Sequence, residues 1–344
     1  MKFETLCLHG GQVPDPTTGA CAVPVYRTTA FVFKNTEHAA NLFALKELGN
    51  IYTRLTNPTT DVLEKRVCLL EGAHPMAGLG LASGTSAVFY AIINLAQAGD
   101  NIVSARNLYG GTYTQFASIL PALGIEVRLV DSTDPENFAK AIDGKTRALF
   151  CETVSNPALE VTDLQAVSAI AHAHGLPLVV DSTFSTPYLT RPLEHGADIV
   201  VHSLTKWFGG HGTGLGGVVV DGGKFNWAGG KHPLFDEPDA SYHGLVYAER
   251  FGKTAFIERD LDITLQPIFA NWTVAGLETQ VGGVSPMSAR AIEAPPEFDL
   301  GLGKGAPPVV VINEALAKAT GWPVTSTLMG LGAFPASDPQ WLGM

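Results

Sequence analysis

The stretch HSLTKWFGGHGTGLGGVVV occupies residues 202–220 and follows the apolar run 199–201. A β-branched run of this kind predicts a buried strand, which places Lys206 at or just past the end of that strand. In open α/β sheets, ligands bind at this carboxyl edge. The hydroxyls of Ser203 and Thr205 flank the lysine, and the glycines after it let the backbone approach a ligand closely. The stretch therefore predicts a ligand site. The plainer alternative is a surface lysine whose stem covers apolar surface.

Outward from this stretch, short β-branched runs alternate with helical patterns from residue 60 to about residue 220. Such alternation predicts βαβ units, and hence an α/β fold with a mostly parallel sheet sandwiched by helices. The expected strands are 101–105, 125–131, 146–153, 176–181, 197–202 and 216–221, and the expected helices are 59–72, 83–100, 112–124, 134–143 and 163–175.

A carboxylate, Asp181, closes the strand LPLVVD that precedes the lysine strand. Because adjacent strands would end at the same sheet edge, we expect Asp181 and Lys206 to share one crevice. A lysine that forms an imine and an acid that holds a proton on a heteroaromatic nitrogen are the pair that pyridoxal phosphate (PLP) chemistry requires. The alternative for Asp181 is a turn former or a helix N-cap.

Two further groups are expected at this edge. Ser83, Gly84 and Thr85 open an apolar helix, whose free N–H groups would attract an anion such as phosphate, although an ordinary capped helix explains them too. Tyr109 follows the strand 101–105 beside two glycines, where its ring could stack on a flat cofactor or belong to the core.

Two motif matches are rejected. Gly212, Gly214 and Gly217 fit GxGxxG, but they precede a strand instead of linking a strand to a helix, which argues against a dinucleotide. The SxxK match at 203–206 lacks the SDN and KTG elements of serine acyl-transfer enzymes. The ten histidines form no ligand set, so we expect no metal.

Composition limits the class of protein. A net charge of −11 disfavours nucleic-acid binding, which needs basic patches. The four cysteines show no CxxC and no regular spacing, which indicates reduced thiols. We see no signal peptide and no apolar run long enough to span a membrane, so we expect a cytoplasmic protein that does not enter membranes.

The chain divides by composition into three parts. Residues 1–59 are loop-rich and are expected to contact a neighbouring subunit, whereas residues 60–258 carry the α/β pattern of a PLP-binding large domain. Residues 259–344 hold nine of the 22 prolines and form an atypical tail. Our hypothesis for this tail is a shifted reading frame, which translation of the other two frames of the source DNA tests.

With these residues assembled, the chain resembles the trans-sulfuration family of PLP-dependent enzymes of cysteine and methionine metabolism, which has fold type I. Within that family, the motifs resemble most the branch that acts on O-acetylhomoserine with sulfide. The resemblance runs from residue 1 to about residue 258. Its motifs are FETLCLHGGQ (3–12), NIYTRLTNPTTDVLEKR (50–66), LYGGTY (108–113), ETVSNPALE (152–160), VVDSTFSTPYL (179–189), the stretch 195–225 and EPDASYHGLVYAERFG (237–252).

The resemblance implies a role for each matching residue. Lys206 would be the Schiff-base lysine and the base, and Tyr109 would stack on the ring and assist the leaving group. Asp181 would pair with the pyridine nitrogen. The remaining cofactor contacts would be Ser83, Gly84, Thr85, Ser203 and Thr205 at the phosphate, Asn156 at the ring hydroxyl, Thr183 beside them, and Tyr52 and Arg54 at a neighbouring subunit's cofactor. One residue departs from the family: Ser182 stands in the place of an asparagine.

The implied reaction turns O-acetylhomoserine and sulfide into homocysteine and acetate, in a tetramer built from dimers. Cystathionine γ-synthase or γ-lyase and methionine γ-lyase activities remain alternatives. A further alternative is an inactive PLP-binding remnant. In the family, a smaller α/β domain after the large one supplies an arginine for the substrate carboxylate, and residues 259–344 show no such segment.

Overall fold

The computed structural model describes residues 1–43, 46–47, 49–240 and 244–260; the tail predicted over 259–344 lies outside them from residue 261 on. Within the described residues, seven strands form one sheet. The strands are β1 Gly78–Leu81, β2 Asn101–Ala105, β3 Glu126–Val130, β4 Thr146–Glu152, β5 Leu178–Asp181, β6 Ile199–Ser203 and β7 Gly217–Asp221. Their order across the sheet is β1-β7-β6-β5-β4-β2-β3.

The sheet is mostly parallel, as the sequence predicts. The pairs β2–β3, β2–β4, β4–β5 and β5–β6 are parallel, and β7 runs antiparallel to both of its neighbours, β6 and β1. All six expected strands are present. Strand β1, with the sequence GLGL, is the one that the sequence reading missed, because two glycines in four residues hide any β-branched signal.

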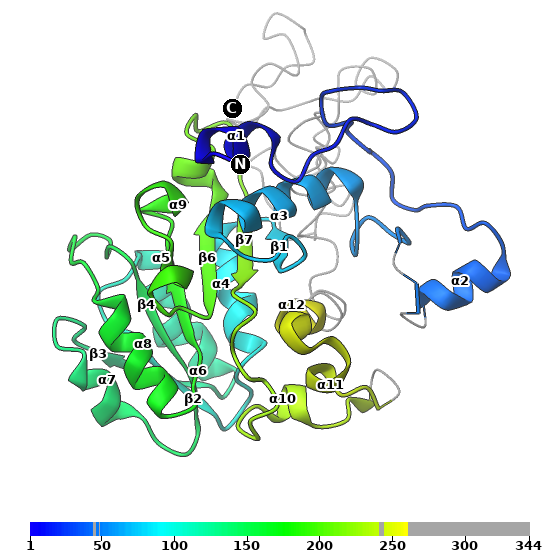
Figure 1. The fold of residues 1–344 in the computed structure, drawn as a ribbon. Coiled ribbons are helices and arrows are strands. Elements are labelled where there is room, and N and C mark those ends of the chain that lie inside the picture. The colour runs from blue at the N-terminus through cyan, green and yellow to red at the C-terminus, as the bar shows by residue number, and fades with distance from the viewer. Residues whose placement is uncertain (44–45, 48, 241–243, 261–344) are drawn as a thin grey trace, which may run out of the picture. The chain divides into compact units, whose positions relative to one another are not determined.

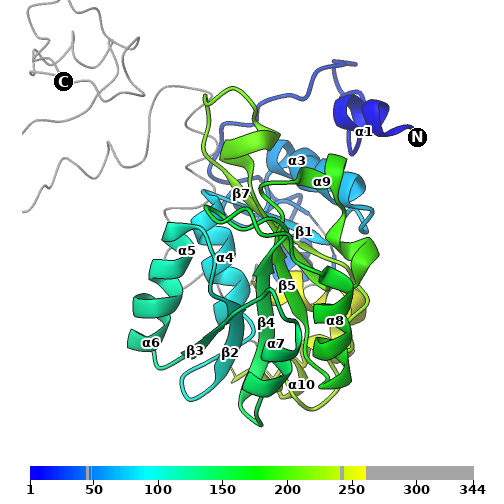
Figure 2. The same ribbon diagram turned by 90° about the vertical axis from the view of Figure 1, so that its left-hand side faces the viewer.

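Helices cover both faces of the sheet (Figures 1 and 2), as βαβ connections require. The helices of the expected α/β region are α3 Pro58–Glu71, α4 Gly84–Ile93, α5 Gly110–Thr114, α6 Leu120–Ala122, α7 Glu136–Ala141, α8 Leu164–Ala173 and α9 Thr186–Leu189. A π-helical turn, η1 Gln115–Ile119, joins α5 to α6, so the helix expected over 112–124 is one continuous helical run. A 3₁₀ turn, η2 Pro192–His195, precedes β6.

Helix α4 is shorter than the helix expected over 83–100. It ends at Ile93, and the next residue, Asn94, is buried and donates from its side-chain amide to the carbonyl of Phe256. The oxygen of the Asn94 side-chain amide accepts a hydrogen bond from Arg259. Arg259 belongs to α12, Ala255–Arg259, which lies beside α4 in Figure 1. These two contacts tie the end of α4 to α12.

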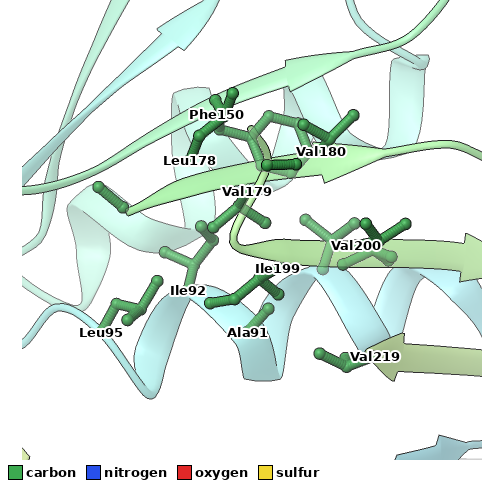
Figure 3. Close-up of a cluster of buried hydrophobic side chains, with 14 of the residues drawn as sticks. Ala91, Ile92, Leu95, Phe150, Leu178, Val179, Val180, Ile199, Val200 and Val219 are labelled. Atoms are coloured by element: carbon green, nitrogen blue, oxygen red, sulfur yellow. The ribbon is translucent and has the colours of Figure 1, made fainter. Parts of the chain in front are cut away.

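The core lies where α4 packs on the central strands. Figure 3 shows Ala91, Ile92 and Leu95 facing the strand residues Val179 and Ile199, and all five are buried. Each of the valine, leucine and isoleucine side chains contributes roughly 1.5–3 kcal/mol on burial, and this contribution holds α4 against the sheet. The sheet edge and the first turn of α4 are thereby held together.

The leader, residues 1–59, contains more helix than expected: α1 Phe3–His9 and α2 Thr36–Phe43. The end of α1 is tied to α3, because the Arg66 guanidinium donates to the carbonyl of Gly10 and to the side chain of Gln12. The remaining helical elements follow the sheet: α10 Pro233–Asp236, α11 Tyr247–Phe251 and the 3₁₀ turn η5 Gly252–Thr254.

None of the helices in the described ranges has the length and apolar character needed to cross a bilayer. All four cysteines are free; Cys7 and Cys21 are exposed, and Cys68 and Cys151 are buried.

The buried carboxyl of Asp221, at the end of β7, predicts a pH dependence of stability. Burial, with a smaller contribution from the charge of Asp198, raises the pKa of Asp221 from 3.8 to about 7. The folded chain therefore keeps a proton that the unfolded chain loses near pH 4, so the free energy of unfolding falls as pH rises from about 4 to 7. Asp221→Asn removes the free-energy cost of burying an ionised carboxylate. We expect it to raise the free energy of unfolding at pH 8 by an amount on the order of 2 to 4 kcal/mol, and by less at pH 5.

Urea denaturation at the two pH values measures this effect. Asp131→Asn is the control, because hydrogen bonds from Thr133 lower the pKa of that exposed carboxyl. An Asp221→Asn gain that is equal at pH 5 and pH 8 would contradict the prediction.

Candidate active site

A cleft of about 520 Å³ opens at the carboxyl ends of β4, β5 and β6. Ten residues expected at a cofactor site line it: Ser83, Gly84, Thr85, Tyr109, Asn156, Asp181, Thr183, Ser203, Thr205 and Lys206. Eight further residues complete the lining: Thr112, Glu152, Val154, Phe184, Trp207, Gly210, Gly212 and Leu215. The volume lies within the range of small-molecule sites.

The N-terminus of α4 forms one wall of the cleft. Ser83 is its N-cap and accepts a hydrogen bond from the N–H of Ser86. This helix end lies against β6 because residue 84 is glycine: a Cβ there would meet the Cβ of Ser203 at 2.5 Å. Gly217 of β7 has the same function, since a Cβ at 217 would stand 2.0 Å from the carbonyl oxygen of Ser83. Free N–H groups at a helix start, next to the Ser203 hydroxyl, suit a phosphate.

Asp181 lies at the end of β5 and is linked to β6 through Thr183. The Asp181 carboxylate accepts the N–H of Thr183 at 2.9 Å, and the Thr183 hydroxyl accepts the N–H of Ser203 at 2.8 Å. Burial raises the pKa of Asp181, and the hydrogen bonds from Thr183 oppose that rise. A carboxylate in this low-dielectric setting interacts strongly with a protonated ring nitrogen.

Lys206 stands just past β6, in the turn η3 Leu204–Phe208, and is exposed to the cleft. No ion pair found within the described ranges engages its amine. The neighbouring Thr205 hydroxyl accepts the N–H of Gly216 at 3.1 Å, which closes the turn onto the start of β7. The expectation that Lys206 and Asp181 share one crevice is confirmed by the cleft that both residues line.

Glu152 is the site residue that the sequence reading missed. It ends β4, is 5% exposed, and is paired in register with Asp181 on β5. Burial, with a contribution from the charge of Asp181, raises the pKa of Glu152 to about 7. The signal was present, because an acid closes the apolar strand 146–152 just as Asp181 closes the next one.

An apolar wall was missed as well. Trp207 is 64% exposed and lines the cleft with Phe184 and Leu215. The rings of Phe184 and Trp207 lie 6.5 Å apart. A tryptophan directly after the lysine was visible in the sequence as the signal for this wall.

Tyr52 and Arg54 are outside the lining of this cleft. The Arg54 guanidinium lies over the Tyr52 ring at 5.4 Å, and Tyr52 is partly exposed. Their expected contact with a neighbouring subunit's cofactor stays a prediction. Ser182, the departure from the family pattern, is fully buried and hydrogen-bonded to the Ser185 hydroxyl, and it is not among the residues that line the cleft.

The lining fits PLP group by group. The start of α4 with the Ser203 and Thr205 hydroxyls suits the phosphate, Asp181 suits the ring nitrogen, and the Lys206 amine suits covalent attachment. The start of α4 can lie against β6 and β7 because residues 84 and 217 are glycines, so the part of the cleft that suits the phosphate depends on two positions without side chains.

Comparison with known proteins gives a consistent picture. The family model described as "Cys/Met metabolism PLP-dependent enzyme" matches residues 4–281, which is further than the residue 258 at which the motif resemblance ends. O-acetyl-L-homoserine sulfhydrylase of Leptospira meyeri is 55% identical over 293 residues, covering 81% of this chain and 66% of that protein. The chain thus spans just under two thirds of that relative's length.

Two solved structures are similar. An O-acetylhomoserine (thiol)-lyase of Campylobacter jejuni, with N'-pyridoxyl-lysine-5'-monophosphate, has a TM-score of 0.76 and 37% identity, and the match covers 86% of this chain and 75% of that one. A cystathionine γ-lyase of Lactobacillus plantarum has a TM-score of 0.60 and 31% identity, over 85% of this chain and 67% of that one.

Proposed function

Because the chain belongs to the Cys/Met metabolism PLP-dependent enzyme family, we propose that it is a transferase that converts O-acetylhomoserine and sulfide into homocysteine and acetate. The identity of 55% to a protein named O-acetyl-L-homoserine sulfhydrylase, against 31% to a cystathionine γ-lyase, supports this activity over the alternatives. The mostly parallel sheet and the TM-score of 0.76 to the Campylobacter structure agree with fold type I.

The observation that carries the proposal is the meeting of Lys206, Asp181 and the start of α4 at one cleft. PLP, when bound, supplies an electrophilic carbon for the substrate's amino group and a protonated ring that stabilises negative charge on the substrate. Lys206 would hold the cofactor covalently through Nζ. Once released, that amine would move protons between the substrate's α-carbon and its neighbouring carbons, and would return one to the α-carbon of the product.

The other lining residues bind and orient. Asp181 would keep the proton on the ring nitrogen, and Thr183 holds the Asp181 carboxylate in place through the bond of 2.9 Å. The first N–H groups of α4 would bind the phosphate together with the hydroxyls of Ser203 and Thr205. These residues would hold the cofactor at its phosphate and at its ring nitrogen.

The remaining lining residues would act near the γ-carbon of the substrate, where the C–O bond to acetate breaks and the C–S bond forms. Tyr109 would stack on the ring and assist the departure of acetate, and Asn156 would contact the ring hydroxyl. The side chains of Phe184, Trp207 and Leu215 would exclude water from the reacting carbon, so that sulfide adds instead of water.

The proposal extends to assembly and location. Tyr52 and Arg54, which lie outside their own chain's cleft, would reach the phosphate of a neighbouring subunit's cofactor, in a tetramer built from dimers. Exposed apolar side chains at Val32, Tyr188 and Leu189 support an interface. Four free cysteines support a reducing, cytoplasmic location. Light scattering measures the subunit number.

The test is an assay of the purified, PLP-supplied chain with O-acetylhomoserine and sulfide. We expect acetate and homocysteine to form in equal amounts, and only when both substrates are present. Formation of cystathionine from cysteine would favour a cystathionine γ-synthase, and release of an α-keto acid and ammonia without sulfide would favour a γ-lyase. A chain that binds PLP but releases no acetate would be the inactive remnant, and the proposed reaction would be wrong.

A further inference from the structure

The two carboxylate oxygens of Glu152 hold two segments that meet at the cleft. One oxygen accepts the backbone N–H of Tyr109 at 2.7 Å, and the other accepts the N–H of Asn156 at 3.0 Å. Tyr109 comes from the loop after β2, whereas Asn156 comes from the loop after β4. Glu152 therefore joins two walls of the cleft that are not adjacent in the sequence.

Both contacts are protected from water. Glu152 is 5% exposed, and above about pH 7, where its carboxyl group is ionised, hydrogen bonds to it are stronger than those at the surface. With both oxygens engaged by backbone donors, Glu152 is placed to act through Tyr109 and Asn156 and not as a proton carrier. This is the arrangement expected of a positioning residue.

A second contact fixes the direction of the Tyr109 ring. A Cβ at residue 111 would meet Cε1 of Tyr109 at 2.6 Å, so the ring lies directly against the backbone of Gly111. Tyr109 nevertheless remains 46% exposed, toward the cleft. The backbone of Tyr109 is anchored by Glu152 and its ring by Gly111, and together the two contacts determine where the ring stands.

We propose that Glu152 is a positioning residue that sets the spacing between Tyr109 and Asn156 by accepting both backbone N–H groups, and so shapes the slot that receives the flat ring of PLP. The inference rests on the proposed function in that it takes PLP as the ring. It goes beyond that function by assigning a role to a lining residue to which the proposed reaction gives none.

We call the pair of hydrogen bonds from Tyr109 and Asn156 to Glu152 the clamp. Two variants distinguish an effect of the clamp from an effect of the negative charge of Glu152. Glu152→Gln keeps the size of the side chain but turns an NH₂ donor toward one backbone N–H. Glu152→Asp keeps the charge beside Asp181 but is one methylene too short to reach both N–H groups. If Glu152 is a clamp, both variants weaken PLP binding at least about tenfold, since each loses a hydrogen bond to a charged acceptor.

The readouts are the dissociation constant of PLP, the visible circular dichroism of the bound cofactor, and kcat separately from KM. The dichroism reports ring orientation, which a role in stability alone would not change. We expect reduced dichroism and reduced kcat in both variants. A lower Tm with wild-type affinity and dichroism would overturn the proposal, and so would a Glu152→Asp variant that matches wild type, because that result would assign the effect to charge.

Glycine variants test the ring contact by an independent route. Gly111→Ala should displace the Tyr109 ring and reduce the dichroism in the same direction as the Glu152 variants. Gly110→Ala is the matched control, because a Cβ there meets nothing within 4 Å and its φ is not positive. Equal dichroism in the two glycine variants would contradict the assigned ring position.

If neither Glu152 variant folds, hydrogen exchange in the unmodified PLP-bound protein decides. The amides of Tyr109 and Asn156 should exchange far more slowly than in a free peptide, and free-peptide rates would overturn the proposal. The PLP dissociation constant, the dichroism and the hydrogen exchange can all be measured without turnover of O-acetylhomoserine, whereas kcat cannot. A chain that binds PLP but releases no acetate would refute the proposed reaction and leave the role of Glu152 to be judged separately.

Discussion

Lys206→Ala is expected to abolish covalent attachment of PLP and to lower kcat by about 10³-fold or more. The amine of Lys206 has two tasks in the proposed reaction, attachment of the cofactor and proton transfer at the substrate carbons. Positioned acid–base groups alone contribute about 10²–10⁴-fold, and alanine offers no replacement for either task. Borohydride reduction followed by peptide mass spectrometry measures the attachment, and acetate release measures kcat.

Two comparisons make this result specific. Lys206→Arg keeps the positive charge but cannot attach the cofactor, so it should resemble Lys206→Ala. Lys140→Ala removes an exposed lysine of α7 that is absent from the lining of the cleft, and should match wild type. A pyridoxyl group found on another lysine, or full activity in Lys206→Ala, would show that the residue is wrongly assigned.

Gly217→Ala is expected to damage both the fold and the cofactor site. A Cβ at residue 217 would stand 2.0 Å from the oxygen and 2.4 Å from the carbon of the Ser83 carbonyl, and 2.9 Å from the N of Gly84. These are backbone atoms between a buried strand and a packed helix, so they cannot move aside as a side-chain tip would. Overpacking of this kind costs about 1–3 kcal/mol.

The same displacement moves the first turn of α4, whose N–H groups are proposed to hold the phosphate. We therefore expect Gly217→Ala to weaken PLP binding as well as to lower the urea midpoint. Gly144→Ala is the matched control, since nothing lies within 4 Å of a Cβ there and its φ is not positive. A Gly217→Ala chain with the urea midpoint and PLP affinity of the control would refute the close approach.

Much of the cleft could be predicted because its residues stand at the ends of periodic segments. Lys206 and Asp181 follow apolar strands, and Ser83 precedes an apolar helix, so local pattern alone places all three at element boundaries. Parallel strands then carry their ends to one edge. Eight of the expected site residues line the cleft for this reason, whereas Asn156 and Thr183, which also line it, were expected there because of the family resemblance.

The glycines show where local reasoning stops. Gly217 belongs to a GxGxxG match that the sequence analysis rejects as a dinucleotide site, because a strand follows the glycines. Strand β7 does begin at Gly217. Its use as a point of close approach to Ser83 depends on helix α4, which lies far away in the sequence. The sequence shows only that residue 217 is a glycine. The packing shows that the backbone of Ser83 occupies the space that a side chain would fill.

The sequence by itself determined the α/β class, the strands on either side of the lysine, and the positions of Lys206, Asp181 and Ser83 at element boundaries, because these follow from short-range periodicity and capping. The tertiary structure decided the strand order, the antiparallel placement of β1 and β7, the early end of α4 at Asn94, and the clamp of Glu152 on Tyr109 and Asn156. Each of these depends on hydrogen bonds or contacts between segments distant in the chain, such as those of Tyr109 and Glu152, which are 43 positions apart. Such contacts form only when the whole core closes, so no local pattern encodes them.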